Sequence, residues 1–404
     1  MKELNVTPRL IMTPGPTSVD PRVSKAMSYS VLGQFDPAFT EIMNETMALI
    51  RQAFQTENQW AFPVDGTSRS GLEAVITSIV SPGDIVLVPI FGRFGHLFVD
   101  LCERAGAKVH TIETEWGTVF EQAAIIDAIN EIQPKVVALV HGETSTGRKQ
   151  PLDKIGPAVR AQGGFLVIDA VATFLGVDFQ TDAWQVDAVI GGAQKCLSIP
   201  SGITPITFND RFAAAINQRK RVEQGVRTSD DLMQENFITS NYFDLTQLMD
   251  YWSDRRLNHH TEATVMVYAL REGLRLALEE GLQNRFARHI YHQKAIKESL
   301  RAMGFTIFGD QAHEMTNMTC VEIPHGVDGE AVRHFLLAEF GIEIASSFGP
   351  MHGKIWRVGN MGYVAQKANM LMFLSAFAAV ADHFNMPGID TKKGLAFAFD
   401  YYAN

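Results

Sequence analysis

The chain has 404 residues, of which 46% are hydrophobic and 20% charged, with 32 glycines and 16 prolines. These proportions exclude a disordered, collagen-like or disulfide-rich chain, and at this length we expect two lobes rather than one core. The formal net charge of −10 argues against a nucleic-acid or anionic-membrane binder. The densest cationic run, Arg219 to Arg221, is expected to face solvent in a charged helical stretch.

The three cysteines, Cys102, Cys196 and Cys320, form no CxxC pair and no zinc spacing. Their scarcity is typical of a reducing compartment. The start of the chain lacks the apolar core of a signal peptide, and no stretch approaches the roughly 20 apolar residues of a membrane helix. We therefore expect a soluble, cytoplasmic protein with no membrane or nucleic-acid partner.

Short apolar runs alternate with helical periodicity over the first two-thirds of the chain. The runs predict strands at 60–64, 85–89, 108–112, 136–140, 165–168, 188–190 and 203–208. Helical patterns separate them, for example at 120–132 and 153–162. Most runs are apolar throughout, which is typical of strands buried on both faces. We predict a mainly parallel sheet in a three-layer α/β domain.

From about residue 262 the pattern changes to two long helices, at 262–282 and 283–303, and then to short strands at 305–308, 318–323 and 356–358. This mixture predicts a smaller α+β domain. We expect an N-terminal arm over 1–19, a large domain over 20–279 and a small domain over 280–404. The role of the tail from Thr391 to Asn404 stays open.

Two isolated charges stand out among apolar surroundings. Lys195 is the only charged residue from Ala188 to Asn209, and burial of such a lysine lowers the pKa of its amine and makes it a nucleophile. Asp169 follows the apolar run 165–168, at the strand end where open α/β sheets bind ligands. Taken alone, the lysine could reach water from a loop and the aspartate could cap a turn.

Together, the lysine and the aspartate fit a cofactor that has one aldehyde and one cationic ring nitrogen, as pyridoxal 5'-phosphate (PLP) does. The turn from Asp65 to Gly71 lies between a strand and a helix expected to begin at Leu72, so its amides and the helix dipole could hold a phosphate. Phe94, between two glycines, offers a ring to stack on a flat cofactor. No Walker loop and no GxGxxG segment follows a strand.

Six ordered motifs resemble those of class V, fold-type I, PLP-dependent aminotransferases, in particular the alanine–glyoxylate and serine–glyoxylate aminotransferases. The motifs lie at 66–69, 92–95, 141–147, 169–171, 194–195 and 356–359. The resemblance extends from Pro14 to about Phe384. It implies a mainly parallel, seven-stranded sheet in the large domain and a homodimer with active sites at its interface.

Carried over position by position, the resemblance implies that Lys195 forms the Schiff base with PLP and shuttles the substrate's α-proton. Asp169 would keep the ring nitrogen protonated. Phe94 and Val171 would sandwich the ring, and Thr144 would reach its polar edge.

The resemblance also implies a phosphate site and a substrate clamp. The phosphate ligands would be Thr67, Ser68, Arg69 and Gln194, joined by Thr261 from the second subunit. Arg357 would hold the substrate carboxylate, a task suited to a planar guanidinium. Gly15 is also assigned to the substrate site.

Two positions depart from the family pattern. Gln34 stands where the family commonly has a histidine, and Asn258 stands where it has a tyrosine, at the start of Asn-His-His-Thr. Both segments should border the substrate pocket, the second across a dimer interface. The adjacent His259 and His260 look like metal ligands, but neighbours on an extended chain point to opposite sides and no further ligand cluster is visible, so no metal is expected.

A carboxamide both donates and accepts hydrogen bonds, so Gln34 and Asn258 could pair with an amide or urea group on the substrate. A site built this way can reject analogues by about 10⁴-fold. The pattern is similar to that of the (S)-ureidoglycine–glyoxylate aminotransferases of purine (allantoin) catabolism, which implies transamination of (S)-ureidoglycine with glyoxylate to N-carbamoyl-2-oxoglycine (oxalurate) and glycine. The alternatives are neutral change at the pocket rim in an alanine– or serine–glyoxylate aminotransferase, and a non-catalytic PLP-binding module.

Overall fold

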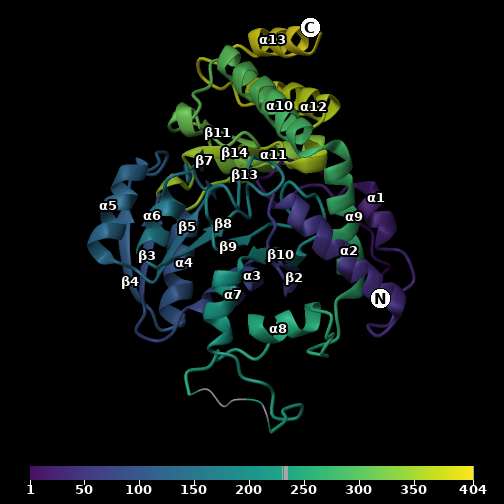
Figure 1. Cartoon of the computed structure of the whole chain (residues 1–404). Coiled ribbons are helices and arrows are strands. Elements are labelled where there is room, and N and C mark those ends of the chain that lie inside the picture. The colour runs from purple at the N-terminus through teal and green to yellow at the C-terminus, as the bar shows by residue number, and fades with distance from the viewer. Residues whose placement is uncertain (230, 232–234, 404) are drawn as a thin grey trace.

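A seven-stranded sheet forms the centre of the larger lobe in the computed structural model, which describes residues 1–229, 231 and 235–403 (Figure 1). Its strands are β2 (Trp60–Gly66), β3 (Ile85–Ile90), β4 (Lys108–Glu113), β5 (Val136–Val140), β8 (Phe165–Asp169), β9 (Ala188–Ile190) and β10 (Gly202–Phe208). The order across the sheet is β2-β10-β9-β8-β5-β3-β4. All neighbours pair in parallel except β10, which is antiparallel to β2 and β9. The predicted mainly parallel, seven-stranded sheet is confirmed.

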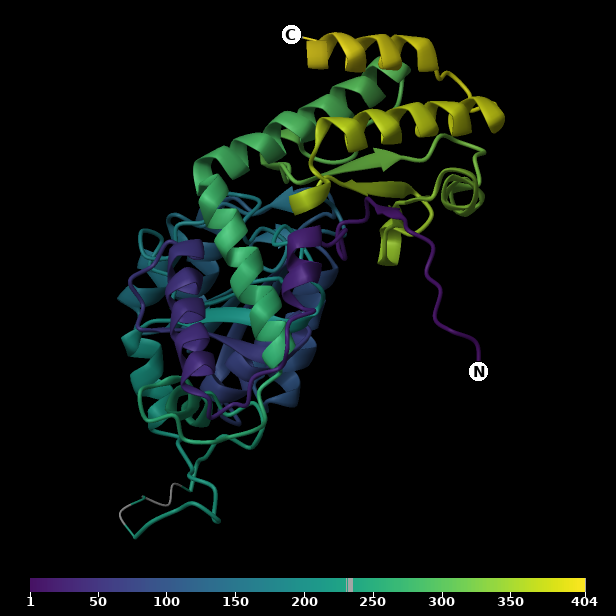
Figure 2. The same ribbon diagram turned by 90° about the vertical axis from the view of Figure 1, so that its right-hand side faces the viewer.

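Helices cover the sheet because its central strands are apolar throughout. Every residue of β5, β8 and β9 is buried, as strands enclosed on both faces require. The helices of this lobe are α1 (Pro21–Ala26), α2 (Pro37–Ala53), α3 (Ser68–Ile79), α4 (Arg93–Arg104), α5 (Gln122–Ile132), α6 (Ile155–Ala161), α7 (Asp210–Asn217), α8 (Leu245–Trp252) and α9 (Thr264–Glu280). Figure 2 shows α2 and α9 in front of the sheet.

The smaller lobe has its own buried core, in which Phe305, Trp356, Phe373 and Phe377 pack together. Its sheet has the order β11-β14-β13, with antiparallel pairs throughout. Its elements are α10 (Leu282–Met303), β11 (Met318–Glu322), α11 (Gly329–Phe340), β12 (Ile342–Glu343), β13 (Ala345–Ser346), β14 (Ile355–Gly359), α12 (Lys367–His383) and α13 (Thr391–Ala403). The C-terminal tail is thus a helix, α13, that packs on α10 and α12. The domain boundaries drawn from the sequence stay a prediction.

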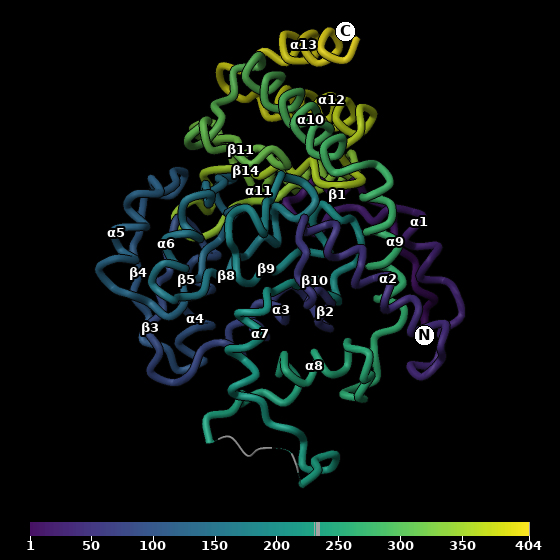
Figure 3. Tube along the Cα trace, viewed as in Figure 1, coloured from purple at the N-terminus to yellow at the C-terminus, as the bar shows by residue number. Residues whose placement is uncertain are grey.

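The N-terminal arm joins the smaller lobe through backbone pairing. Strand β1 (Leu10–Ile11) pairs in parallel with β12, so the arm lies beside the C-terminal elements (Figure 3). A second short pair, β6 (Gly142–Glu143) and β7 (Arg148–Lys149), is antiparallel and follows β5. In the described part of the chain, no helix is long and apolar enough to cross a membrane.

Two predicted elements differ from the structure. Helix α3 begins at Ser68 rather than at Leu72, so the predicted phosphate turn includes the first turn of the helix itself. The run at 305–308 is not a strand, and only Ile307 forms an isolated bridge, to Val321. The backbone N–H of Phe305 instead donates to the Leu300 carbonyl, because this segment closes the C-terminus of α10 before it enters the core.

The basic run at 219–221 does not face solvent from a helix, and that prediction is wrong. Helix α7 ends at Asn217, and Arg219 is only 6% exposed. Its guanidinium donates to the carbonyls of Thr77, Ser78 and Val80 at the end of α3. The last carbonyls of a helix lack intrahelical donors, and this buried arginine supplies them.

Candidate active site

A cavity lies at the carboxyl ends of β8 and β9, where the sequence places Asp169 and Lys195. The residues that line it are Thr67, Ser68, Arg69, Leu72, Phe94, Leu97, Gly142, Thr144, Asp169, Val171, Ala172, Gln194 and Lys195. Nine of these 13 residues are the ones that the sequence assigns to the cofactor within one chain. The structure therefore brings the predicted set together, although the part that each residue plays stays a prediction.

Asp169 faces the cavity from the end of β8, and Lys195 faces it from the turn that follows the neighbouring parallel strand β9. Burial lowers the pKa of the Lys195 amine to about 8, and the nearby Arg357 adds to this effect. The amine donates to the Pro14 carbonyl. Burial also raises the pKa of Asp169 to about 7, although its Oδ1 accepts a 2.9 Å bond from the Val171 N–H. A cationic group in the cavity would stabilise the ionised form of this carboxyl.

The start of α3 forms an anion site beside Lys195. Thr67 precedes the helix and makes no side-chain cap bond, while Ser68 and Arg69 open its first turn. The Ser68 hydroxyl donates to Gln194 Oε1 over 3.1 Å, which joins this turn to the segment before Lys195. Free amides, the helix dipole and a guanidinium together suit a phosphate dianion. Gly66, at φ +110°, lets the chain turn sharply into the helix.

A buried carboxylate that the sequence did not single out holds the aromatic wall of the cavity. Glu143 Oε2 accepts a 2.8 Å bond from the Phe94 N–H, and its Oε1 accepts bonds from the N–H and hydroxyl of Ser145. Gly92 leaves room for this carboxylate, because a Cβ there would lie 2.3 Å from Glu143 Cγ. Glu143 thereby fixes the backbone of Phe94 at the cavity. The available signal was one acidic residue inside the segment 141–147.

Arg357 approaches the cavity from the smaller lobe on β14. It is 5% exposed, and its Nε and Nη1 donate to the carbonyls of Ser346 and Thr144 over 2.7 and 3.0 Å. Burial lowers the pKa of its guanidinium to about 10. Gly15 lies against Lys195, and a Cβ at this glycine would lie 2.6 Å from the lysine Nζ. Both residues therefore lie near the Lys195 amine, and their part in substrate binding stays a prediction.

Three of the predicted residues do not reach this cavity in the same chain. The Gln34 Nε2 donates to Asn258 Oδ1 over 2.7 Å, and Gln34 and Thr261 border a separate depression. Phe35, which is 77% exposed, also lines that depression. From the sequence, Gln34 is expected at the border of the substrate pocket, and Asn258 and Thr261 are expected to reach it across a subunit interface; that assembly stays a proposal.

The arrangement as a whole fits PLP. A buried amine with a lowered pKa suits an aldehyde, a carboxyl at the neighbouring strand end suits a ring nitrogen, and the start of α3 suits a phosphate. Phe94 and Val171 both line the cavity, where a flat ring would lie. The fold and the site therefore define a PLP-dependent enzyme of fold type I.

Comparisons with known proteins place the chain more closely. The family "Aminotransferase class-V" matches residues 22–357. An (S)-ureidoglycine–glyoxylate transaminase of Bacillus subtilis (strain 168) is 57% identical, over 100% of this chain and 97% of that protein. The crystal structure of the Bacillus subtilis ureidoglycine–glyoxylate aminotransferase has a TM-score of 0.94 at 56% identity, covering 100% of each chain. An alanine–glyoxylate aminotransferase of Drosophila melanogaster is 32% identical, over 93% of this chain and 92% of that protein. The chain belongs to the class V aminotransferases, and it is a PLP-dependent aminotransferase.

Proposed function

We propose that this aminotransferase moves the amino group of (S)-ureidoglycine to glyoxylate, giving N-carbamoyl-2-oxoglycine (oxalurate) and glycine, as a step in purine (allantoin) catabolism. The observation that carries the proposal is the 57% identity to a transaminase of that name over the whole chain. The paired carboxamides of Gln34 and Asn258 support it, because their donors and acceptors match a urea group.

PLP, when bound, supplies an aldehyde that takes up the amino group and a ring that withdraws electrons from the substrate's α-carbon. Lys195 would bind at the aldehyde position and would move the substrate's α-proton at its Nζ. A pKa of about 8 leaves part of this amine unprotonated near neutral pH, so it can accept that proton. The carboxylate of Asp169 would accept a hydrogen bond from the ring nitrogen and stabilise its positive charge.

The remaining residues hold the cofactor and orient the substrate. Thr67, Ser68, Arg69 and Gln194 would bind the phosphate at the start of α3. Arg357 already uses its Nε and Nη1 for two carbonyls, so its Nη2 edge would bind the substrate carboxylate. The bond from Arg357 to the Thr144 carbonyl ties this clamp to the wall of the cofactor cavity.

We further propose a cytoplasmic homodimer in which each cavity is completed by Gln34, Asn258 and Thr261 from the second subunit. Val31 and Phe35, beside Gln34, are 66% and 77% exposed, and Leu257, beside Asn258, is 43% exposed. Neighbouring apolar side chains with this exposure are typical of a surface that another protein covers.

Single half-reactions of the purified, PLP-loaded enzyme test the substrate. The absorbance change of the cofactor is followed after mixing with freshly generated (S)-ureidoglycine, L-alanine or L-serine in the absence of an oxo acid. We expect (S)-ureidoglycine to react fastest. A faster reaction with alanine or serine would assign the enzyme to the other glyoxylate aminotransferases instead, and no reaction with any amino donor would indicate a binding module.

A further inference from the structure

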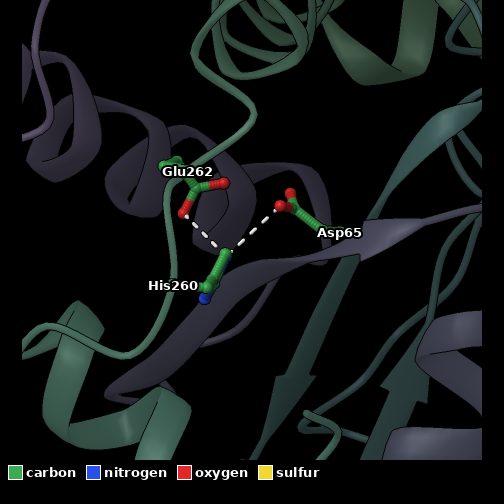
Figure 4. A group of neighbouring side chains, drawn as sticks. All are labelled: Asp65, His260 and Glu262. Atoms are coloured by element: carbon green, nitrogen blue, oxygen red, sulfur yellow. Dashed lines mark ion pairs between the residues drawn. The ribbon is translucent and has the colours of Figure 1, made fainter.

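Three side chains converge next to the phosphate turn without being part of the cofactor cavity. Asp65 lies near the end of β2, while His260 and Glu262 lie on the loop before α9 (Figure 4). The His260 Nε2 is 3.2 Å from Asp65 Oδ2 and 3.7 Å from Glu262 Oε2. One ligand atom from each residue lies within 4.8 Å of those of the other two. The side chain of Glu262 is only 1% exposed.

Hydrogen bonds account for only part of this convergence, since the Tyr242 hydroxyl donates to Asp65 Oδ2 over 3.5 Å. Asp65 Oδ1, His260 Nε2 and Glu262 Oε2 are all buried and without a hydrogen-bond partner among the described residues. Within the same part of the chain, the ion pairs of these two carboxylates involve His260 alone, with no lysine or arginine. Burial and the neighbouring Asp65 raise the pKa of Glu262 well above its usual range, so either a proton or a metal cation must offset the repulsion between the two carboxyl groups.

The neighbouring histidine shows that Nδ1 of His260 carries a proton. The His259 Nε2 is 3.1 Å from the Asn241 carbonyl, which can only accept, so this nitrogen of His259 is the donor. In a neutral His259, Nδ1 is then an acceptor, and it lies 2.8 Å from His260 Nδ1. His260 Nδ1 is therefore the donor, and when the ring is neutral its Nε2 lone pair is directed at the two carboxylates.

We propose that Asp65, His260 and Glu262 bind one divalent metal ion of the first transition row, of the Zn²⁺ type. One imidazole nitrogen and two carboxylate oxygens are ligands that Zn²⁺ takes, at about 2.0–2.2 Å, with water in a further position. His259 holds the imidazole from behind, as outer partners of metal-bound histidines do. The rings of Tyr242 and Tyr251, 5.4 and 5.2 Å from that of His260, keep it in place.

The ion would connect two segments that adjoin residues assigned to the cofactor phosphate. Asp65 is followed by Gly66 and Thr67, where the phosphate turn begins, and His260 and Glu262 flank Thr261. The sequence did not reveal this group, because its first member is far from the other two along the chain. The expectation that His259 and His260 point to opposite sides is also wrong, since a bend at His260 brings their rings into contact, with centroids 5.0 Å apart.

Zinc binding to the PLP-loaded enzyme tests this site. The protein is stripped with a chelator, dialysed against increasing free Zn²⁺, and its metal content is measured by mass spectrometry. We expect one Zn²⁺ per chain in the wild type and a loss of affinity of more than about 100-fold in D65N and in E262Q, since even outer partners contribute 10- to 100-fold. The matched control is D310N, which removes another carboxylate from a histidine, His313, at 2.6 Å; its zinc binding should equal that of the wild type.

Two results would overturn the proposal. One is a wild-type enzyme that takes up no stoichiometric Zn²⁺, which would mean that a proton neutralises the group. The other is equal affinity in the wild type, D65N and E262Q, which would place the ion elsewhere. If the variants do not fold, anomalous X-ray scattering from zinc-loaded wild-type crystals decides, and a peak away from these three residues refutes the assignment.

Discussion

Replacing Asn258 with aspartate tests the hydrogen-bond donor of this amide while keeping its acceptor. The Gln34 Nε2 donates to Asn258 Oδ1 over 2.7 Å, and an aspartate keeps an oxygen for that bond. The substitution removes only the Nδ2 group, which has two hydrogens to donate. N258D therefore keeps the contact with Gln34 and deletes the group that we expect to recognise a urea oxygen.

The size of the effect follows from the number of bonds lost. A neutral hydrogen bond contributes about 0.5–1.5 kcal/mol, so two lost bonds cost about 1–3 kcal/mol. This corresponds to a decrease of roughly 5- to 150-fold in kcat/KM for (S)-ureidoglycine. L-Alanine has no group for Nδ2 to bind. The added negative charge acts on the carboxylates of both donors, so the ratio of their kcat/KM values isolates the lost amide.

The assay is the steady-state kcat/KM of N258D for (S)-ureidoglycine and for L-alanine at fixed glyoxylate. The matched control is N130D, because Asn130 Oδ1 also accepts from a glutamine, Gln162, over 2.6 Å at the surface. N130D should leave both values unchanged. Equal losses for the two donors in N258D would refute the reasoning and leave Asn258 a structural role.

Further predictions concern the lysine and a buried arginine. In G15A, the new Cβ would lie 2.3 Å from Lys195 Cδ, at a backbone φ of +101° that alanine rarely adopts. We expect kcat to fall by at least about tenfold and the absorbance spectrum of the cofactor to change. A normal kcat and spectrum would show that the N-terminal arm moves to make room for the methyl group. The pKa of Lys195 is lowered to about 8, so the amine is mostly protonated below that pH. The rate of PLP uptake by the apoenzyme should therefore rise about tenfold per pH unit up to pH 8 and then level off. A rate that continues to rise up to pH 10 would contradict this lowered pKa. R219M leaves the carbonyls at the end of α3 without donors. Denaturant titrations should show a free energy of unfolding that is lower by about 2–4 kcal/mol, while kcat stays unchanged. An unaltered free energy of unfolding would contradict the capping role of Arg219.

The sheet could be predicted because its strands are buried on both faces. A short run that is apolar throughout is stable as a strand in the middle of the sheet, where helices cover both faces. The predicted bounds of 136–140 and 188–190 agree with β5 and β9. The cavity could be predicted for a related reason. Parallel strands end at one edge, so Asp169 and Lys195, which follow neighbouring strands, had to lie close together.

Contacts between residues far apart along the chain could not be predicted in the same way. The sequence shows that Arg219 is charged, but not that the carbonyls of α3 lie within its reach. It shows a glutamate at 143, but not that this carboxylate binds the Phe94 N–H. The approach of Asp65 to His260 likewise depends on how the loop before α9 crosses the end of β2. Each case needs tertiary geometry that local patterns do not carry.

The most direct test of the account is a competition between amino donors. The PLP-loaded enzyme receives equal concentrations of (S)-ureidoglycine and L-alanine with isotopically labelled glyoxylate, and mass spectrometry quantifies labelled glycine, oxalurate and pyruvate. We predict that oxalurate accounts for nearly all of the oxo acid formed with the labelled glycine. Pyruvate as the main oxo acid would contradict the proposed function.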